Sequence, residues 1–579
     1  MHTRSARSRG VAAIVASLAL LGSGAAISGT PAQAVPPVED CAEALPVADV
    51  TKGMAVDGLT VTEGTEPESF SGEVLGVLGD GIAPGVDMIL ADMSSTEIDR
   101  VGIWQGMSGS PVYDAEGNLL GAVAYGMSWG PSSVAGITPY EQMDDYMPAE
   151  AAPEVRVPAG VARTIAARTD VTARQASEGL ERLRVPLTIN GISQQRLDKV
   201  RNAERGDYLH GRGRAGTLVG ATAGAAADPS SIKDGGNLGA ALSYGTITAG
   251  GVGTVTDRCG DQVVGFGHPM MFSGPTSLGL MPADALYIQE DSLGAGYKVA
   301  NLASPAGTIT QDRLTGITGA VGEPPSEVDI ASNVTYGSRE REGLSHSLSQ
   351  DWNADVTLMQ VLSLHDVTID AIQPGSETAG VTITGTSGGE EFTVESEDRY
   401  VSDFDIAFEG LWSLADLVYI VSGLDDVQIT SISTDAEVTD STDTLRIGKV
   451  QQRRGGKWTT VNRRNPARTS GGGMLVLRVE LKGPDGAQWL AQHVRVPAKA
   501  KRTGRLQVVG GSWTWNDALF GADSVEQVQK ALAGDVRNDE VQTRLDFWAG
   551  RDNVSKRVTS EPQDLVVRGH RSASVVVRR

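Results

Sequence analysis

Alternating apolar and polar positions, broken by Gly, Pro, Asp and Asn, run through residues 35 to 150. The stretch FSGEVLGVLGDGIAPGVDMILADM is an example. A period of two buries one face of a strand, and turn residues end each run. The pattern therefore predicts short β-strands separated by tight turns. A similar Gly-rich pattern returns from residue 215 to about 345.

The remaining segments of the chain differ from these in composition and in hydrophobic pattern. Residues 151 to 214 are rich in Ala, Arg and Leu, which predicts a helical linker or insert. Alternation in DVTLMQVL, DVTIDAI and MLVLRVELKG predicts a separate β-sandwich of immunoglobulin-like type over residues 346–515. Residues 516–579 are expected to form a C-terminal tail with one amphipathic helix at 524–536. These patterns together predict a mainly β protein.

Composition and charge narrow the possible partners. The chain has 579 residues, 71 of them Gly and only 5% aromatic, which suits several β-rich domains with many turns. Its formal charge of −23 argues against nonspecific binding of nucleic acid, because polyanions repel an acidic surface. The basic run at 446–468 is interpreted as a solvated hairpin face. We therefore expect no nucleic-acid partner.

The N-terminus has the three parts of a secretory signal peptide. A basic start, MHTRSARSRG, precedes an apolar core and the small-residue site Ala32-Gln33-Ala34. Ser and Gly interrupt the apolar run, which is short for a membrane span, so a signal peptide at 1–34 is favoured over an anchor. We expect an exported protein, secreted or held at the cell envelope, with no integral membrane segment in the mature chain. The Ala-, Arg- and Gly-rich leader suits a bacterium.

Two cysteines, Cys41 and Cys259, lie in the exported part. An even pair in an oxidising compartment predicts one disulfide between them. HExxH, CxxC and EF-hand patterns do not occur in the sequence, so it predicts no metal site and no cofactor.

The segment GIWQGMSGSPVYDAEGNLLGAVAYG surrounds one serine, Ser108, with small residues. Gly106 and Gly109 permit the positive-φ backbone that aims N–H groups at a developing oxyanion. PVY, the turn DAEGN and LLGAVAYG read as a hairpin. The pattern therefore places Ser108 on a loop that enters a β-hairpin, where a nucleophilic serine could lie.

The whole stretch resembles the SpoIVB family of serine peptidases, in which the nucleophile lies in a GMSGSP segment followed by a strand of the GAV type. The resemblance implies a chymotrypsin-like double β-barrel domain, here at residues 35–345 with the helical insert inside it. It also implies hydrolysis of protein or peptide substrates through an acyl-enzyme, often with self-cleavage.

A serine nucleophile needs a base, and His268 is the strongest candidate of the seven histidines. It stands in VVGFGHPMMFSGP, where an apolar strand runs into a Gly-His-Pro corner. This corner resembles the one that carries the general base in the SpoIVB family. His210 in DYLHGRGRAG is the weaker alternative.

The remaining parts of the site are less sharply defined. Family resemblance places the orienting carboxylate upstream of the serine, where Asp92 lies at nearly the family separation and Asp99 is the alternative. Asp261, just before the GFGHP strand, is a third option. Backbone N–H groups of Ser108 and of Gly106 or Met107 are expected to form the oxyanion hole.

The order of the motifs departs from the family, because here the serine precedes the histidine. Triads are defined by geometry and not by chain order, so a permuted arrangement is permissible. We expect an exported serine endopeptidase. The alternatives are a catalytically inactive peptidase-like protein that binds or scaffolds at the envelope, and a domain that cuts itself once.

Overall fold

The computed structural model describes residues 41–127, 130–143, 154–155, 157–169, 171–183, 188–202, 228–292, 294–500, 503–514, 516–549 and 552–578. The predicted signal peptide and His210 lie outside the described residues. Short 3-10 helices cover Val47–Asp49, Tyr140–Gln142, Pro229–Ser231, Gln350–Trp352, Ile406–Phe408 and Gly511–Trp513.

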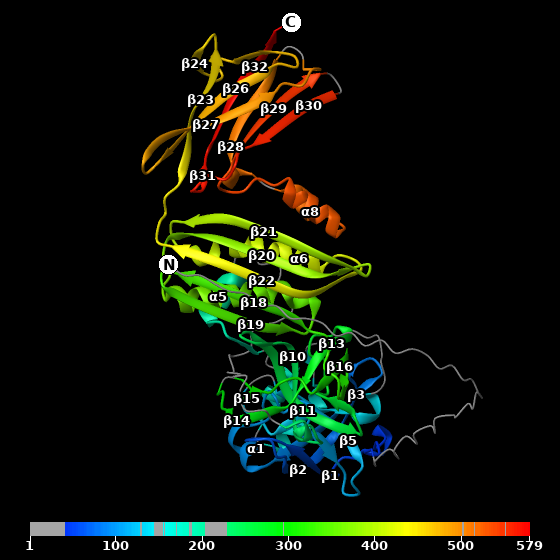
Figure 1. Ribbon diagram of the computed structural model, residues 1–579. Helices are drawn as coiled ribbons and strands as arrows, with labels where there is room; N and C mark the ends of the chain where they lie inside the picture. Colours follow the sequence, from blue (N-terminus) through cyan, green and yellow to red (C-terminus); the bar gives the residue numbers. More distant parts are fainter. Residues whose placement is uncertain are drawn as a thin grey trace, which may run out of the picture. The chain divides into compact units, whose positions relative to one another are not determined.

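The first β-rich segment closes into a six-stranded antiparallel barrel, drawn in blue and cyan in Figure 1. Hydrogen bonding follows the order β4-β1-β2-β3-β6-β5 and returns from β5 to β4. A single helical turn, α1 (Thr96–Val101), connects β3 to the serine loop. The strands are β1 (Ala55–Thr60), β2 (Glu68–Ala83), β3 (Val86–Ser94), β4 (Pro111–Tyr113), β5 (Leu119–Met127) and β6 (Val134–Pro139).

The second segment closes a barrel of the same size, in the order β10-β13-β16-β17-β12-β11 and back to β10. A hairpin, β14 (Ala283–Gln289) with β15 (Tyr297–Leu302), projects between β13 and β16. The predicted double β-barrel is confirmed. The barrel strands are β10 (Asn237–Gly245), β11 (Thr248–Cys259), β12 (Gln262–Gly265), β13 (Gly274–Met281), β16 (Gly307–Arg313) and β17 (Gly316–Val321).

Helices and short strands connect the two barrels between residues 154 and 202, and residues 203–214 of the predicted helical insert lie outside the described residues. The helices are α2 (Ala159–Arg168), α3 (Ala173–Glu178) and α4 (Gln194–Asn202). Strands β7 (Glu154–Val155) and β8 (Leu180–Arg182) extend the first sheet, and β9 (Thr188–Asn190) extends the second.

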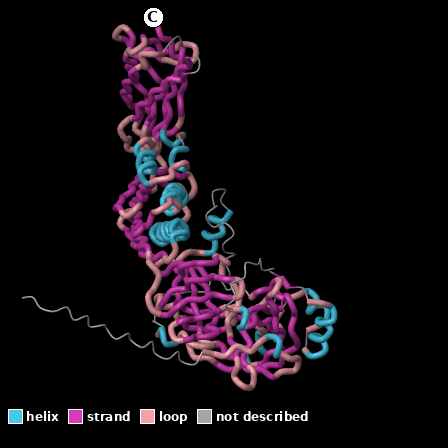
Figure 2. Tube along the Cα trace, turned by 90° about the vertical axis from the view of Figure 1, so that its right-hand side faces the viewer, coloured by secondary structure: helices cyan, strands magenta, loops and turns pink. Residues whose placement is uncertain are grey.

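Residues after the second barrel do not start the predicted sandwich, and this prediction is corrected. Two helices, α5 (Asn353–Ile369) and α6 (Leu411–Ser422), cover one face of a sheet, as Figure 2 shows. The sheet continues from β10 through β19 (Arg339–Ser347), β18 (Val328–Tyr336), β22 (Val427–Thr439), β20 (Gly375–Ser387) and β21 (Glu390–Ser402). Helix α5 is buried on nearly every side, so its sequence lacks the polar face that would have distinguished it from a strand.

The β-sandwich lies further along the chain than predicted, between residues 445 and 578. Two five-stranded sheets share one apolar core. One contains β23 (Leu445–Arg454), β24 (Lys457–Thr460), β26 (Met474–Gly483), β27 (Gly486–Arg495) and β31 (Val567–Arg568). The other contains β25 (Ala467–Ser470), β28 (Thr503–Gly510), β29 (Val541–Ala549), β30 (Asp552–Thr559) and β32 (His570–Arg578). The predicted tail is thus part of the sandwich.

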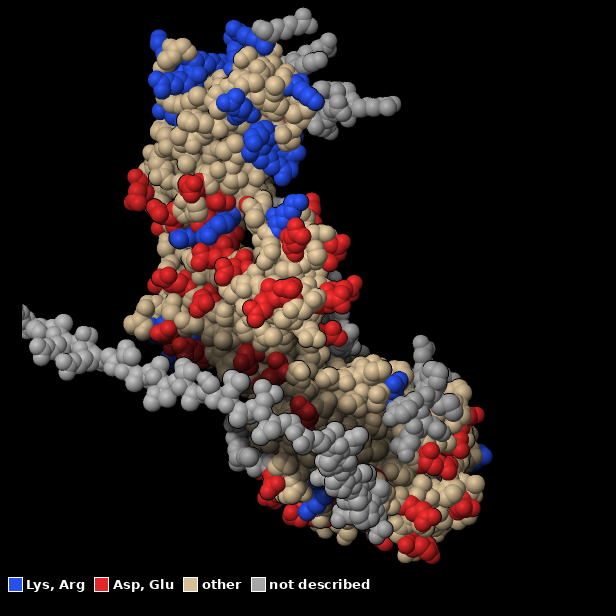
Figure 3. Space-filling view, turned by 45° about the vertical axis from the view of Figure 1, so that its right-hand side comes forward, with Lys and Arg blue, Asp and Glu red and all other residues tan. Residues whose placement is uncertain are grey.

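The expected C-terminal helix is present as α8 (Val525–Ala533), after the short α7 (Asp517–Phe520). On the face drawn in Figure 3, Lys and Arg gather over the sandwich, whereas Asp and Glu gather over the helix-covered sheet and the barrels. In the described part of the chain, every helix is too short or too polar to cross a membrane.

The predicted disulfide is confirmed. Cys41 and Cys259 are bonded, with Cα atoms 5.0 Å apart and a sequence separation of 218 residues. The bond joins the segment before the first barrel to the end of β11 in the second barrel. It therefore ties together the two barrels that supply the candidate site.

Candidate active site

Ser108 lies on the loop between α1 and β4, and its glycines adopt the conformation that the sequence predicted. Gly106 and Gly109 have φ values of 93° and 98°, which L residues with side chains rarely adopt. A Cβ atom at Gly109 would lie 1.9 Å from the carbonyl oxygen of Thr254. The loop can therefore approach β11 this closely only because the residue is glycine.

Strand β11 of the second barrel holds the serine loop by donating hydrogen bonds to the carbonyl oxygens of the loop. The Thr254 N–H donates to Ser108 O at 2.7 Å, and the Thr256 hydroxyl donates to Gly109 O at 2.8 Å. The Thr254 hydroxyl reaches Gly106 O at 3.2 Å. These bonds fix the backbone on both sides of Ser108 against the opposite barrel.

His268 lies on a corner that leaves the second barrel just after β12. Phe266 has a φ of 69°, an uncommon value for a residue with a side chain, and Gly267 has a φ of 67°. The Thr138 hydroxyl at the end of β6 donates to Gly267 O at 2.6 Å. The first barrel thus holds the histidine corner, just as the second holds the serine loop. Backbone strain of this kind clusters at functional sites.

The structure brings Ser108 and His268 together from 160 residues apart. His268 Nε2 lies 2.9 Å from Ser108 Oγ. The exposed fraction of Ser108 is 0% and that of His268 is 1%, so the pair is shielded from solvent. This distance is within the range expected for a nucleophile and its base.

The hydrogen bonds at the imidazole determine its tautomer. His268 Nδ1 lies 2.9 Å from the carbonyl oxygen of Pro269, which can only accept a hydrogen bond. The Nδ1 atom therefore carries the ring proton in the neutral form. Nε2 is left with its lone pair toward Ser108, so the serine hydroxyl donates to it. This is the tautomer that a general base requires.

The candidate aspartates are not the groups that orient the ring. Asp92 in β3 accepts from the Ser133 hydroxyl at 2.6 Å, and Asp99 in α1 accepts from Ser94 at 3.2 Å. Asp261 is exposed at the turn before β12. None of the three forms a hydrogen bond with His268 in the described part of the chain. The bond seen at Nδ1 runs to the Pro269 carbonyl instead.

A carboxylate that the sequence analysis missed holds the chain just beyond the histidine. Asp312 in β16 is fully buried and accepts from the N–H groups of Met270 and Met271 at 2.8 and 2.7 Å. Ser273 lies 3.3 Å from the same carboxylate through both its N–H and its hydroxyl. Asp312 therefore fixes the exit of the His268 corner.

The N–H groups expected to form the oxyanion hole differ in whether they already have an acceptor. The Met107 N–H donates to Trp104 O at 3.2 Å, and the Gly109 N–H donates to Val123 O at 2.8 Å, so both are engaged. Within the described residues, the N–H groups of Gly106 and Ser108 have no acceptor. Of the two expected pairs, Ser108 with Gly106 therefore has both N–H groups available, whereas the Met107 alternative has its N–H engaged.

Lys298 is a second buried polar group that the sequence did not indicate. It lies in β15, and its Cβ atom would be 2.8 Å from a Cβ added at Gly106. Its N–H donates to Gln105 O at 2.8 Å, and its ammonium donates to Asn237 Oδ1 at 2.8 Å. Burial lowers the pKa of Lys298 from 10.5 to about 7. A lysine that is only 1% exposed thus supports the loop that carries Ser108.

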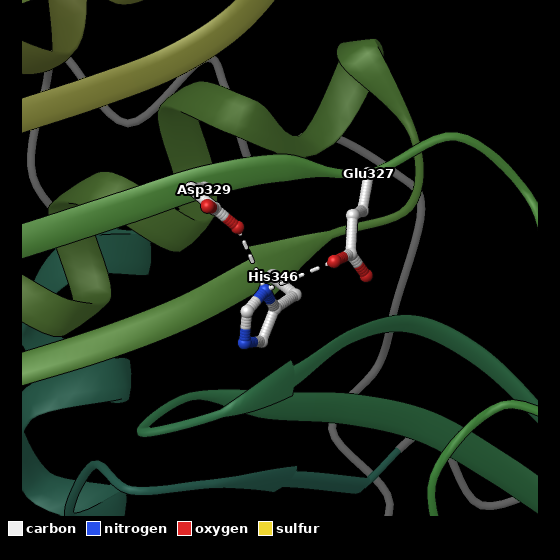
Figure 4. Close-up of side chains that lie close together, drawn as sticks. All are labelled: Glu327, Asp329 and His346. Atoms are coloured by element: carbon white, nitrogen blue, oxygen red, sulfur yellow. Dashed lines mark hydrogen bonds and ion pairs between the residues drawn. The ribbon is translucent and has the colours of Figure 1, made fainter.

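Among the described residues, one group of side chains away from Ser108 is arranged so that it could share a metal ion. Glu327, Asp329 and His346 place their ligand atoms within 4.8 Å of one another, as Figure 4 shows. Asp329 and His346 lie on β18 and β19, which follow the second barrel, and Glu327 immediately precedes β18. They are therefore considered apart from the serine site.

Comparisons of the chain with models of protein families, with curated proteins and with solved structures found no match. The fold and the site therefore define the class of protein by themselves. It is a double β-barrel protein with a buried Ser-His pair, in which each barrel provides one member of the pair and holds the loop of the other.

Proposed function

We propose that the chain is an exported serine endopeptidase of the SpoIVB type. The observation that carries the proposal is the 2.9 Å contact between Ser108 Oγ and His268 Nε2, in the tautomer that leaves Nε2 free to accept a proton. The N–H groups of Gly106 and Ser108 lie on the same loop and have no acceptor within the described residues. The substrate class is protein or peptide, and the chemistry needs no cofactor.

Acylation follows from these positions. Ser108 Oγ forms a bond to the scissile carbonyl carbon while its proton moves to His268 Nε2. The carbonyl oxygen becomes negative and accepts hydrogen bonds from the Gly106 and Ser108 N–H groups. The C–N bond then breaks, and Nε2 returns the proton to the leaving amine. The Pro269 carbonyl keeps its hydrogen bond to Nδ1–H throughout.

Deacylation repeats the sequence with water as nucleophile. His268 Nε2 takes a proton from the water, whose oxygen bonds to the acyl carbon. The bond from the carbon to Ser108 Oγ breaks, and Nε2 returns the proton to that oxygen. The products are a new carboxyl terminus and the free enzyme.

One observation favours the alternative, a catalytically inactive peptidase-like protein that binds or scaffolds at the envelope. Both Ser108 and His268 are shielded from solvent, so a substrate carbonyl reaches Oγ only when the surrounding chain moves. A protein that kept the fold only for binding would have no need of that movement.

An assay for cleavage of an unfolded protein substrate distinguishes the endopeptidase from the inactive alternative. The mature chain, from residue 35 onward, is incubated with reduced and alkylated protein, and new amino termini are counted while intact mass reports self-cleavage. Ser108→Ala should lower the rate about a thousandfold or more. Ser110→Ala is the matched control, because its buried hydroxyl donates to Thr60 and not to His268. Folded wild type that produces no new termini, in the substrate or in itself, would support the inactive alternative.

A further inference from the structure

Three side chains converge near the start of β18 and the end of β19, outside the serine site. His346 Nδ1 lies 2.8 Å from Asp329 Oδ1 and 3.5 Å from Glu327 Oε1. Figure 4 shows the imidazole facing both carboxylates. Two carboxylates thus approach a single ring nitrogen, whereas a neutral imidazole has at most one proton there to donate.

The supporting strands hold these residues in a row. Asp329 and His346 are direct partners across β18 and β19, and His346 is in turn the direct partner of Tyr244 in β10. Direct cross-strand partners project on the same face of a sheet. Three adjacent strands therefore present Asp329, His346 and Tyr244 side by side, with Glu327 immediately before β18.

Tyr244 contacts both His346 and Glu327 and so holds these two side chains in place. Its ring stacks on the His346 ring, with centroids 4.5 Å apart and planes inclined by 22°. Its hydroxyl donates to Glu327 Oε2 at 2.6 Å, which leaves Oε1 directed toward His346. Metal ligands are commonly oriented by such partners behind them, which bond to the atoms that the metal does not use.

The distances suit a small divalent cation. Ligands at about 2.1 Å from tetrahedral Zn²⁺ are separated by about 3.4 Å, and the observed separations of 2.8 and 3.5 Å lie on either side of this value. Side chains of Asp329 and Glu327 are 56% and 40% exposed, so a cation can enter from solvent. One nitrogen and two carboxylate oxygens are a ligand set that Zn²⁺ accepts.

We propose that Glu327, Asp329 and His346 bind one Zn²⁺ ion, with water completing the coordination. Two of the ligands come from strands and Glu327 lies immediately before one, and their spacing in the sequence matches none of the common metal motifs. The site is independent of the peptidase activity proposed above, because it lies on the sheet that continues beyond the second barrel.

Calorimetric titration of tag-free, metal-stripped mature protein with ZnCl₂ tests the proposal. Wild type should bind one Zn²⁺ per chain, and Co²⁺ in its place should show the visible absorption of a four-coordinate ion. His346→Ala should weaken Zn²⁺ binding at least 100-fold. Tyr244→Phe, which keeps the stacked ring and loses the hydroxyl, should weaken it by about 10- to 100-fold.

The matched control is His493→Ala, which removes an exposed histidine of β27 and should leave Zn²⁺ binding unchanged. Asp329→Asn, a nearly isosteric change, provides a second test if the alanine variant does not fold. Absence of Zn²⁺ binding to wild type would overturn the proposal. So would binding that survives both His346→Ala and Asp329→Asn, or a preference for Ca²⁺ over Zn²⁺.

Discussion

Burial of the Lys298 ammonium beside the Ser108 loop destabilises the folded chain electrostatically. Its ammonium is buried with Asn237 as its acceptor, and the Asn237 amide is itself held by Gly64 O and Ala283 O at 3.0 Å. The oxygen of Asn237 therefore points at the lysine and cannot turn away. Burying a charge costs free energy unless it is paired, and Asn237 offers only a neutral acceptor.

This cost predicts a pH dependence of stability. The pKa of Lys298 is about 7 in the folded chain and near 10.5 when unfolded, so the unfolded chain binds more protons between these values. The free energy of unfolding should rise with pH from about 7 to 10.5 by up to about 1.4 kcal/mol per pH unit. Below pH 7, Lys298 is charged in both states, so the destabilisation caused by burying its charge should reach its full value. Lys298→Met should remove this contribution.

Urea unfolding of wild type and Lys298→Met across pH 6 to 10 measures the effect as a difference between the two chains, because other groups titrate equally in both. The variant should show a smaller rise in the free energy of unfolding over this range. Parallel pH profiles of the two proteins would contradict the low pKa of Lys298.

The residues of the site differ in how visible they are in the sequence. Ser108 and His268 could be predicted because glycines and a proline around them signal corners where a side chain is presented. Asp312 and Lys298 could not, because each lies in a strand whose neighbours give no sign that a polar residue is buried there. Within the described residues, the group seen at Nδ1 of His268 is a backbone carbonyl, which every residue has, so residue type could not indicate it.

The serine loop depends on how closely it packs against β11. Gly109 combines a positive φ with a Cβ position only 1.9 Å from Thr254 O. Gly117, in the turn between β4 and β5, has a φ of 90° but open space where a Cβ would lie. Substitution at Gly117 therefore tests backbone strain alone, whereas substitution at Gly109 tests backbone strain together with steric overlap.

Gly109→Ala should destabilise the fold more than Gly117→Ala by about 2 kcal/mol or more, because only the former forces the loop away from β11. Peptidase activity should be lost in Gly109→Ala and retained in Gly117→Ala, since the loop carries Ser108. Denaturant unfolding and the cleavage assay measure the two effects. Equal destabilisation by both substitutions would mean that the loop can relax away from β11 without cost.

Secondary structure was predictable where one face of an element meets solvent. Strand β1 and helix α8 have such faces, and α8 begins directly after Ser524, the first residue of the predicted helix. Helix α5 was mistaken for strands because both its sides are buried, so neither period dominates its pattern. The same error moved the predicted start of the sandwich toward the N-terminus, because α5, α6 and the strands β20 to β22 were assigned to one domain with the first sandwich strands.

The whole molecule distributes one site over two barrels. Thr138 of the first barrel holds the histidine corner, and Thr254 and Thr256 of the second hold the serine loop. The disulfide between Cys41 and Cys259 joins the same two barrels. Because each barrel supplies one half of the pair, the serine half can precede the histidine half in the chain without changing the geometry.

The central claim is that His268 activates Ser108, and labelling with a fluorophosphonate tests it most directly. Mass spectrometry of the labelled mature chain should place the phosphonate on Ser108, and Ser108→Ala and His268→Ala should each abolish labelling. Ser110→Ala should still be labelled, because its hydroxyl is hydrogen-bonded to Thr60. Folded wild type that takes up no label, or a label that persists in His268→Ala, would contradict the account.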